Sequence, residues 1–226
     1  MRIWVTRTEP GASRLSRRLA SAGHGVLNAP VLHVEATSNA APTGCFDFVL
    51  FVSSHAVERA FATGWGAALI PGVAAGIGRA AETALRSRGI RTKLGAVADA
   101  AAVTRALVTA PPRTLVVKGE GGRDVVQNWV RSRGASVTEW DVYRRVPARP
   151  AIADERIDAI VAASGEGLRE IAEIWFADGR SGSVHLLVPS SRVAGLAVAC
   201  GFDNAVVTAG AADDAVMAAL GKLRES

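Results

Sequence analysis

A glycine-rich turn is the first segment of this 226-residue chain whose residue types could do chemistry. It reads Lys118-Gly119-Glu120-Gly121-Gly122-Arg123, follows an apolar run at 114–117 and leads directly into a helical pattern. A strand, a glycine turn and a helix N-terminus form a site where backbone N–H groups can approach an anion. Asp124 stands where a dinucleotide motif G-x-G-x-x-G needs its third glycine, and no G-x-x-x-x-G-K-[ST] loop occurs. The turn therefore predicts an anion site without a nucleotide signature.

Short polar turns follow five other apolar runs of the chain in the same way. Ser and Thr at such positions are also ordinary helix N-caps, so one turn by itself fits capping alone. Six turns, four of them with a guanidinium group, favour an anionic ligand with many attachment points. The candidate binding residues are Thr6, Arg7, Ser53, Ser54, Gly78, Arg79, Lys118, Gly119, Gly121, Gly122, Arg123, Ser164, Gly165, Ser190, Ser191 and Arg192.

Tyr143, the only tyrosine, is the one candidate catalytic residue. It fits either a packing aromatic between strands or a phenol that donates a hydrogen bond, or acts as a weak acid, in a ligand cleft. The four histidines are scattered and read as surface or cap residues, and neither G-x-S-x-G nor H-E-x-x-H is present. Carboxylates in the polar turns would repel an anion, and we expect Glu120 to point to solvent.

The segments that must position these residues alternate between apolar strands and amphipathic helices. The predicted strands are 2–6, 46–52, 114–118, 157–163, 184–188 and 204–208, and each precedes a helical pattern with a period of 3.6 residues. Continuous apolar strands interleaved with such helices are typical of parallel sheets covered on both faces. Ligands of such sheets bind beyond the carboxyl ends of the strands, where the polar turns lie.

The chain also repeats itself at a shift of about 111 residues. The segment that begins at Ile3 aligns with the one at Leu115, and Ser53 aligns with Ser164. This repeat predicts a duplicated unit of about 110 residues with about five strands in each copy.

Two divisions of the chain into lobes remain open. The copies form two contiguous halves, or 31–37 and 142–148 pair as a hinge and each lobe mixes both copies. In the second case 1–32 with 149–226 form one lobe, 38–141 the other, and 33–37 and 142–148 the hinge strands. Either division predicts a ligand cleft between two lobes.

Composition excludes several other classes of protein. Apolar residues make up 49% and charged residues 21%, which excludes a disordered chain. The net charge is +5, mostly from arginine, but it is spread along the chain without a basic and aromatic stripe, which disfavours nucleic-acid binding. No apolar run reaches the ~18 residues of a membrane span. The opening residues read as a strand instead of a secretory signal, so we expect Cys45 and Cys200 to be buried thiols in a reducing cytoplasm.

The ordered set of segments resembles the uroporphyrinogen-III synthase family. "KGEGGRDVVQNWVRSRGASVTEWDVYRR" is similar to the middle signature of that family, a glycine-rich turn followed about twenty residues later by a Y-x-R segment. "VTRTEP", "FVSSHAVERA", "GIGRAAETAL", "AASGEGLREI" and "LLVPSSRVAGLAVACGF" follow in the family's order and spacing. The similarity covers about residues 2–223. Thr8 departs from the proline of the family's opening motif, and Ala80 and Ala81 stand where relatives often have a threonine.

The resemblance implies two flavodoxin-like lobes with parallel five-stranded sheets, joined by a two-stranded hinge. It implies closure of the linear tetrapyrrole hydroxymethylbilane, with loss of water and inversion of ring D, and gives Tyr143 the role of a donor near the departing hydroxyl. It also implies a cytoplasmic monomer without cofactor or metal, with transient contact to the preceding pathway enzyme. A non-catalytic two-lobed anion-binding protein and an inactive relative acting as a scaffold are the alternatives.

Overall fold

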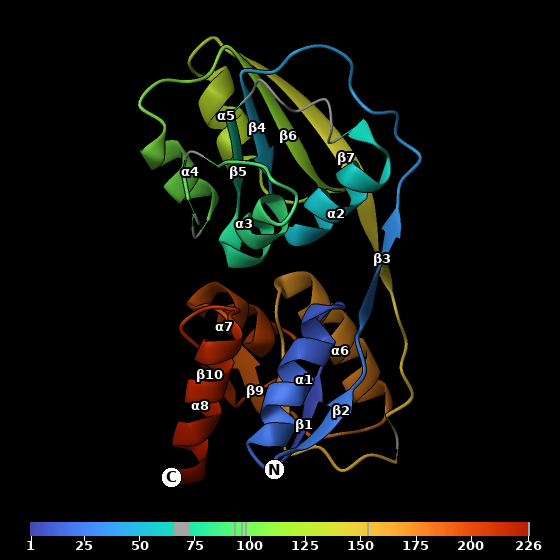
Figure 1. Ribbon diagram of the computed structural model, residues 1–226. Helices are drawn as coiled ribbons and strands as arrows, with labels where there is room; N and C mark the ends of the chain where they lie inside the picture. The colour runs from blue at the N-terminus through green and yellow to red at the C-terminus, as the bar shows by residue number, and fades with distance from the viewer. Residues whose placement is uncertain (66–72, 93, 96, 98, 153, 226) are drawn as a thin grey trace. The chain divides into compact units, whose positions relative to one another are not determined.

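The computed structural model divides the chain into two compact units, each built around a five-stranded sheet (Figure 1). It describes residues 1–65, 73–92, 94, 95, 97, 99–152 and 154–225. The first unit comprises Met1–His33 and Val146–Ser226, and the second comprises Val34–Arg145. Each unit therefore contains residues from both copies of the repeat.

The sheet of the first unit has the strand order β10-β9-β8-β1-β2. Its strands are β1 (Arg2–Val5), β2 (Gly25–Asn28), β8 (Ala159–Val161), β9 (His185–Val188) and β10 (Ala205–Val207). Every pairing in this sheet is parallel. Helices α1 (Gly11–Ser21) and α8 (Asp213–Glu225) bury one apolar cluster, and α6 (Gly165–Ala177) and α7 (Ser191–Ala199) bury another. The apolar runs of the sequence are buried because helices cover both faces of the sheet.

The sheet of the second unit has the strand order β3-β7-β6-β4-β5. Its strands are β3 (Leu32–Ala36), β4 (Phe48–Phe51), β5 (Val73–Gly76), β6 (Arg113–Gly119) and β7 (Ser136–Pro147). Strands β5, β4, β6 and β7 pair in parallel. Helices α2 (Ser54–Ala62) and α3 (Gly78–Arg86) pack in one cluster, and α4 (Ala100–Ala106) and α5 (Val125–Arg131) in the other. The prediction of two similar α/β sheets is confirmed.

The repeat is visible in the positions of the strands. β6 begins 111 residues after β1, and β8 begins 111 residues after β4. At the same shift, the long β7 covers both β2 and β3, which are separated by Ala29, Pro30 and Val31. β2 belongs to the first sheet and β3 to the second, so β3 and β7 are the segments along which the chain passes between the units (Figure 1).

Three expectations about individual residues need correction or restatement. Cys45, expected to be buried, is exposed in the segment between β3 and β4, and Cys200 is partly buried at the end of α7. His24, expected to be a surface or cap residue, is buried with 9% of its area exposed, and its backbone N donates to Leu19 O at the end of α1. Within the described ranges, no helix is both long enough and apolar enough to cross a membrane.

Candidate functional site

The predicted site residues fall into two groups at the carboxyl ends of the parallel strands. The first unit contains Thr6, Arg7, Ser164, Gly165, Ser190, Ser191 and Arg192, after the neighbouring strands β1, β8 and β9. The second unit contains Ser53, Ser54, Gly78, Arg79, Lys118, Gly119, Gly121, Gly122, Arg123 and Tyr143, at the ends of β4, β5 and β6 and on β7. Within each unit these ends share one edge of the sheet, because parallel strands point the same way.

Three of the predicted serines are helix N-caps. Ser53 Oγ accepts from Ala56 N at 3.1 Å, Ser164 Oγ accepts from Gly167 N at 3.1 Å, and Ser190 Oγ accepts from Val193 N at 3.4 Å. Each bond uses one acceptor position of a hydroxyl and satisfies one free amide of the helix end. The hydroxyl hydrogens are not consumed by these bonds, so capping leaves each serine able to donate to another group.

Gly119 makes room for the ring of Tyr143. A register shift after Lys118 places Gly119 opposite Tyr143 on the neighbouring strand, and Glu120 N donates to Tyr143 O at 2.8 Å. A Cβ on Gly119 would lie 2.4 Å from Cε2 of the ring and 2.5 Å from Cζ. The lack of a side chain here serves packing of an aromatic across the strands. Gly121 and Gly122 have φ of +72° and +101°, which only glycine adopts readily, so these two glycines shape the turn itself.

The Tyr143 side chain belongs to a hydrogen-bonded cluster within the second unit. Its ring is buried with 1% exposed area, in the apolar cluster beneath α2 and α3. Tyr143 Oη lies 3.1 Å from Ser53 Oγ, and Arg145 Nη2 donates to Tyr143 Oη at 3.2 Å. The Arg145 guanidinium carbon also lies 5.4 Å from the ring centroid. The ring therefore packs in the core, as the first interpretation predicts, and the hydroxyl joins a polar group at the strand ends. That the phenol donates to a ligand stays a prediction.

The sequence did not single out His55 and Arg145 as part of this cluster. The His55 and Tyr143 ring centroids are 5.7 Å apart, so His55 is a packing neighbour of Tyr143. Burial lowers the pKa of His55, the charge of Glu58 opposes this shift, and the charges of Arg145 and Arg59 add to it. The sequence signal that could have pointed to these two residues is their spacing from Tyr143 and Ser53. Arg145 lies two residues from Tyr143 on one strand, and His55 lies two residues after Ser53.

Thr6 and Arg7, predicted to hold an anion, use their side chains within the fold. Thr6 Oγ1 donates to Val161 O at 2.7 Å, and Arg7 Nη1 pairs with Asp213 Oδ1 at 2.7 Å. The side chains of Arg7 and Asp213 are only 9% and 6% exposed, and Arg14 Nε also contacts this carboxylate at 2.7 Å. Both side chains therefore bond within the fold, and their contact with a ligand stays a prediction. Asp213 lies 206 residues from Arg7 and offers no local sequence signal.

The charges around Asp213 shift the two pKa values through different causes. Burial lowers the pKa of Arg7 in spite of the facing carboxylate. Burial alone would raise the pKa of Asp213, but the bond from Arg14 and the charges of Arg7, Arg14 and Arg18 lower it. The pKa of Asp213 is lowered because its carboxylate faces three cations, and the pKa of Arg7 is lowered because Arg7 is the most buried of these three.

The amino end of α1 already has a carboxylate of its own. Glu9 accepts from Ser13 N at 3.0 Å and from Ser13 Oγ at 2.8 Å, and Asn28 Nδ2 also donates to it. Burial raises the pKa of Glu9, but these hydrogen bonds and the charge of Arg17 outweigh it and lower the pKa. Glu9 therefore already occupies the positive amino end of α1, where an anionic ligand would otherwise bind.

Lys118 is likewise occupied by neighbouring carboxylates. Its Nζ lies 3.1 Å from Glu139 Oε2 and 3.4 Å from Asp141 Oδ1, and its side chain is 12% exposed. Burial lowers the pKa of Lys118, but the two carboxylates on β7 outweigh it and raise the pKa. That this ammonium also holds a ligand stays a prediction. Glu120 is exposed, as expected.

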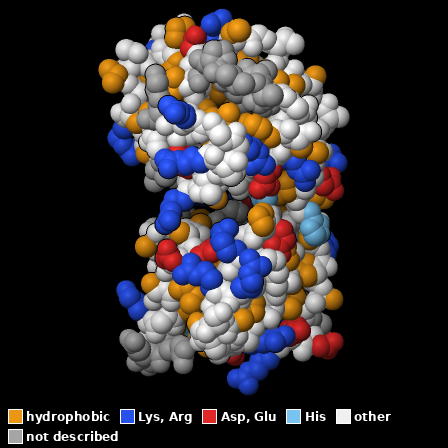
Figure 2. Space-filling view, viewed as in Figure 1, with side chains coloured by type: hydrophobic (Ala, Val, Ile, Leu, Met, Phe, Trp, Pro, Cys, Tyr) orange, Lys and Arg blue, Asp and Glu red, His pale blue; other side chains and the backbone are white. Residues whose placement is uncertain are grey.

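Three predicted arginines remain exposed. Among the residues that the structure describes, Arg79, Arg123 and Arg192 form no ion pair. A Cβ on Gly165 would lie 3.6 Å from Arg192 Nη1, so this guanidinium lies beside the start of α6. On the face of the molecule that Figure 2 shows, the basic side chains in blue and the acidic side chains in red are interspersed. In the described part of the chain, these three guanidiniums are therefore exposed and have no carboxylate partner.

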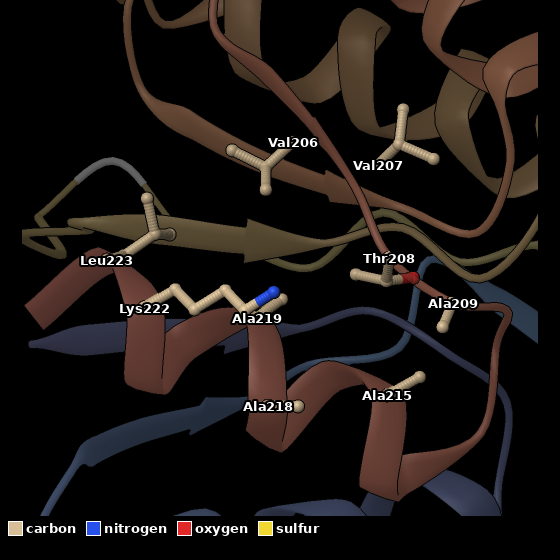
Figure 3. Close-up of a pocket in the computed structure, with 9 residues that line it drawn as sticks. All are labelled: Val206, Val207, Thr208, Ala209, Ala215, Ala218, Ala219, Lys222 and Leu223. Carbon is tan, nitrogen blue, oxygen red and sulfur yellow. The ribbon is translucent and has the colours of Figure 1, made fainter.

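A separate groove of about 360 Å³ lies between β10 and α8. Figure 3 shows its lining, which is Val206, Val207, Thr208, Ala209, Ala215, Ala218, Ala219, Lys222 and Leu223. It includes none of the predicted site residues and has one charged side chain, so it does not have the many anchors that the turns offer. In the described part of the chain, no three His, Cys, Asp or Glu side chains are grouped so that they could hold a metal ion.

Comparison with known sequences supplies the family. Residues 13–218 match the family described as uroporphyrinogen-III synthase HemD. Uroporphyrinogen-III synthase of Salmonella typhimurium is 28% identical, with 97% of this chain and 100% of the relative covered. The same enzyme of Escherichia coli K12 is 30% identical over an alignment that spans 48% of each chain, about half the length of that relative.

Solved structures agree in fold. A mutant uroporphyrinogen III synthase from the extremely thermophilic bacterium Thermus thermophilus aligns over 100% of both chains with a TM-score of 0.64 and 15% identity. The uroporphyrinogen-III synthetase of Helicobacter pylori aligns over 98% of both chains, also with a TM-score of 0.64, and 11% identity. At these identities the structures establish the shared two-lobed fold, while the sequence match extends over most of the chain. This chain belongs to the uroporphyrinogen-III synthase family.

Proposed function

We propose that the protein cyclises hydroxymethylbilane to uroporphyrinogen III, with loss of water and inversion of ring D, as a cyclising hydro-lyase of tetrapyrrole and heme biosynthesis. Family membership supports the activity, and the observation that carries the chemistry is the hydroxyl pair of Tyr143 and Ser53. This pair lies in the unit whose strand ends also bear Arg79 and Arg123, two guanidiniums without a carboxylate partner among the described residues.

The substrate is a polyanion, because every pyrrole carries an acetate and a propionate group. Exposed arginines and capped helix ends can hold carboxylates at several points without a strong base. Because Arg7 and Lys118 pair with carboxylates within the fold, the proposal relies on the exposed Arg79, Arg123 and Arg192 as cationic anchors. That one substrate molecule is held by both units, in a cleft between them, stays a prediction.

The reaction requires control of geometry more than a powerful catalytic group. The C–O bond of the hydroxymethyl group breaks with its electron pair on oxygen, the pyrrole nitrogen supplies electrons, and the oxygen leaves as water after gaining a proton. Ring closure and rearrangement return a proton to the solvent, so the sum is substrate to product plus water. The protein must favour attack at the substituted carbon of ring D over direct closure. A hydroxyl that donates to the departing oxygen assists the first step.

The test is the identity of the product. The purified protein is incubated with freshly generated hydroxymethylbilane, the products are oxidised, and the type I and type III isomers are separated by chromatography. We expect type III. Type I alone, formed at the spontaneous rate, would instead support a binding protein or an inactive relative. We further propose a cytoplasmic monomer that needs no cofactor or metal and meets the preceding pathway enzyme only transiently. Sedimentation of the purified chain at several concentrations tests the monomer.

A further inference from the structure

Two hydroxyl groups of the second unit are each held by a group that can only donate. Tyr143 Oη and Ser53 Oγ are 3.1 Å apart. Arg145 Nη2 lies 3.2 Å from Tyr143 Oη, and Ala56 N lies 3.1 Å from Ser53 Oγ. A guanidinium and a backbone amide have no acceptor, so both oxygens accept a hydrogen bond from outside the pair.

The number of hydroxyl hydrogens then determines how many hydrogen bonds the Tyr143 and Ser53 pair can donate to its surroundings. The two oxygens carry two hydroxyl hydrogens, and one of these lies between them. The second must point away from the pair, so the pair always presents one donor to its surroundings. Tyr143 has 1% of its area exposed, whereas Ser53 is only partly buried. The outward hydrogen is therefore the one on Ser53, with the Tyr143 hydroxyl donating to Ser53 Oγ.

We propose that Arg145 is a positioning residue that acts through Tyr143 to make the Ser53 hydroxyl a hydrogen-bond donor toward the oxygen that departs from the substrate. An oxygen that accepts from a cation donates more strongly through its own O–H, so Arg145 favours the direction from Tyr143 to Ser53. This inference rests on the proposed function for the nature of the departing oxygen. The order of donors does not depend on the proposed function, because it is argued from the burial of Tyr143 and from the donor-only neighbours of both oxygens.

A double-mutant cycle separates this role from direct contact of Arg145 with substrate. We expect R145A to lower kcat by about 10-fold with little change in KM, as for a weakened donor. In the Y143F background, which lacks the phenol, R145A should change kcat less than about 2-fold. R145K, which restores a cationic donor, should recover part of the rate. Equal losses in both backgrounds, or a wild-type rate in R145A, would overturn the proposal.

Arg144 supplies the matched control on the same strand. Its guanidinium pairs with Glu35 at 3.0 Å and its side chain is 56% exposed, so it is held by a different partner from Arg145. R144A therefore removes the same charge and the same side-chain atoms as R145A. We expect R144A to keep the wild-type kcat and to have the same melting temperature as R145A. If R144A lowered kcat as much as R145A does, the effect would belong to net charge and the proposed relay would fail.

A measurement on the free protein tests the order of donors without turnover. The Tyr143 hydroxyl proton should exchange slowly and show an NMR cross-peak to the β protons of Ser53. R145A should move this resonance, and R144A should leave it in place. An unchanged resonance in R145A refutes the order of donors even if the wild type makes type III. A resonance that moves in R145A, together with a wild type that makes only type I, refutes the proposed function and the departing oxygen as the acceptor, but not the order of donors.

Discussion

The substitution Gly119→Ala should displace the Tyr143 ring. The new Cβ would stand 2.4 Å from Cε2, 2.5 Å from Cζ and 2.9 Å from Cδ2, whereas ordinary contacts begin near 3.4 Å. The ring must therefore retreat by about 1 Å. The bonds from Tyr143 Oη to Ser53 and Arg145, now 3.1 and 3.2 Å, would then stretch beyond useful length.

The expected cost follows from these two effects. Overpacking of a filled core costs about 1–3 kcal/mol, and each lost hydrogen bond about 1 kcal/mol. We expect the free energy of unfolding to fall by about 3 kcal/mol and the melting temperature of the second unit by about 10 °C. Activity should fall at least as far as in Y143F, because the hydroxyl pair is separated.

Denaturant unfolding followed by circular dichroism, together with the isomer assay, measures both effects. Gly195→Ala is the matched control, since nothing lies within 4 Å of its Cβ position in α7 and an alanine there should stabilise the helix by about 0.5–1 kcal/mol. In a Y143A background the ring is absent, so G119A should cost less than about 1 kcal/mol. A G119A protein with wild-type stability and activity would refute the packing argument.

Three further substitutions test the assignments of individual residues. Tyr143→Phe should lower the rate of type III formation by about 10- to 100-fold in the isomer assay, and full activity would remove the phenol from the mechanism. Arg123→Ala should raise KM several-fold at low salt and leave the melting temperature unchanged. The control Arg105→Ala on α4 should leave KM at the wild-type value. Equal KM values in the two variants would remove Arg123 from the site. Asp213→Asn should lower the free energy of unfolding by about 3 kcal/mol, because the buried Arg7 loses its partner. The folded-state pKa of Asp213 lies below its ordinary 3.8, so its contribution is present above that pH and is lost as the pH falls through the folded value. Urea unfolding of D213N and wild type should therefore converge at low pH, and a constant difference down to about pH 2 would contradict this role.

The fold could be predicted from the sequence because its signals are local and repeated. Apolar runs of four or five residues and helices of 3.6 period mark the elements, and the shift of 111 residues shows that they form two sets. The same shift identifies β7 as the equivalent of β2 and β3 together, although Pro30 interrupts only the first copy. What the local pattern could not decide is which strand joins which sheet, because that depends on pairing between residues far apart in the chain.

The site was harder to predict because competing partners come from distant segments. Arg7 and Lys118 have the residue types of anion ligands, yet Asp213 and Glu139 neutralise them inside the fold. Gly119 looked like an amide that approaches an anion, but the ring of Tyr143 fills the space beside it. The serines were easier, since a helix that starts after a strand needs a cap wherever it lies.

The product isomer tests the central claim most directly. Hydroxymethylbilane closes spontaneously to type I, so the fraction of type III measures the contribution of the protein without a separate blank rate. As the concentration of wild-type protein rises at fixed substrate, the product should change from type I toward type III, and Y143F should need a higher concentration for the same fraction. A product that stays type I at every protein concentration, from a folded chain, would contradict the account.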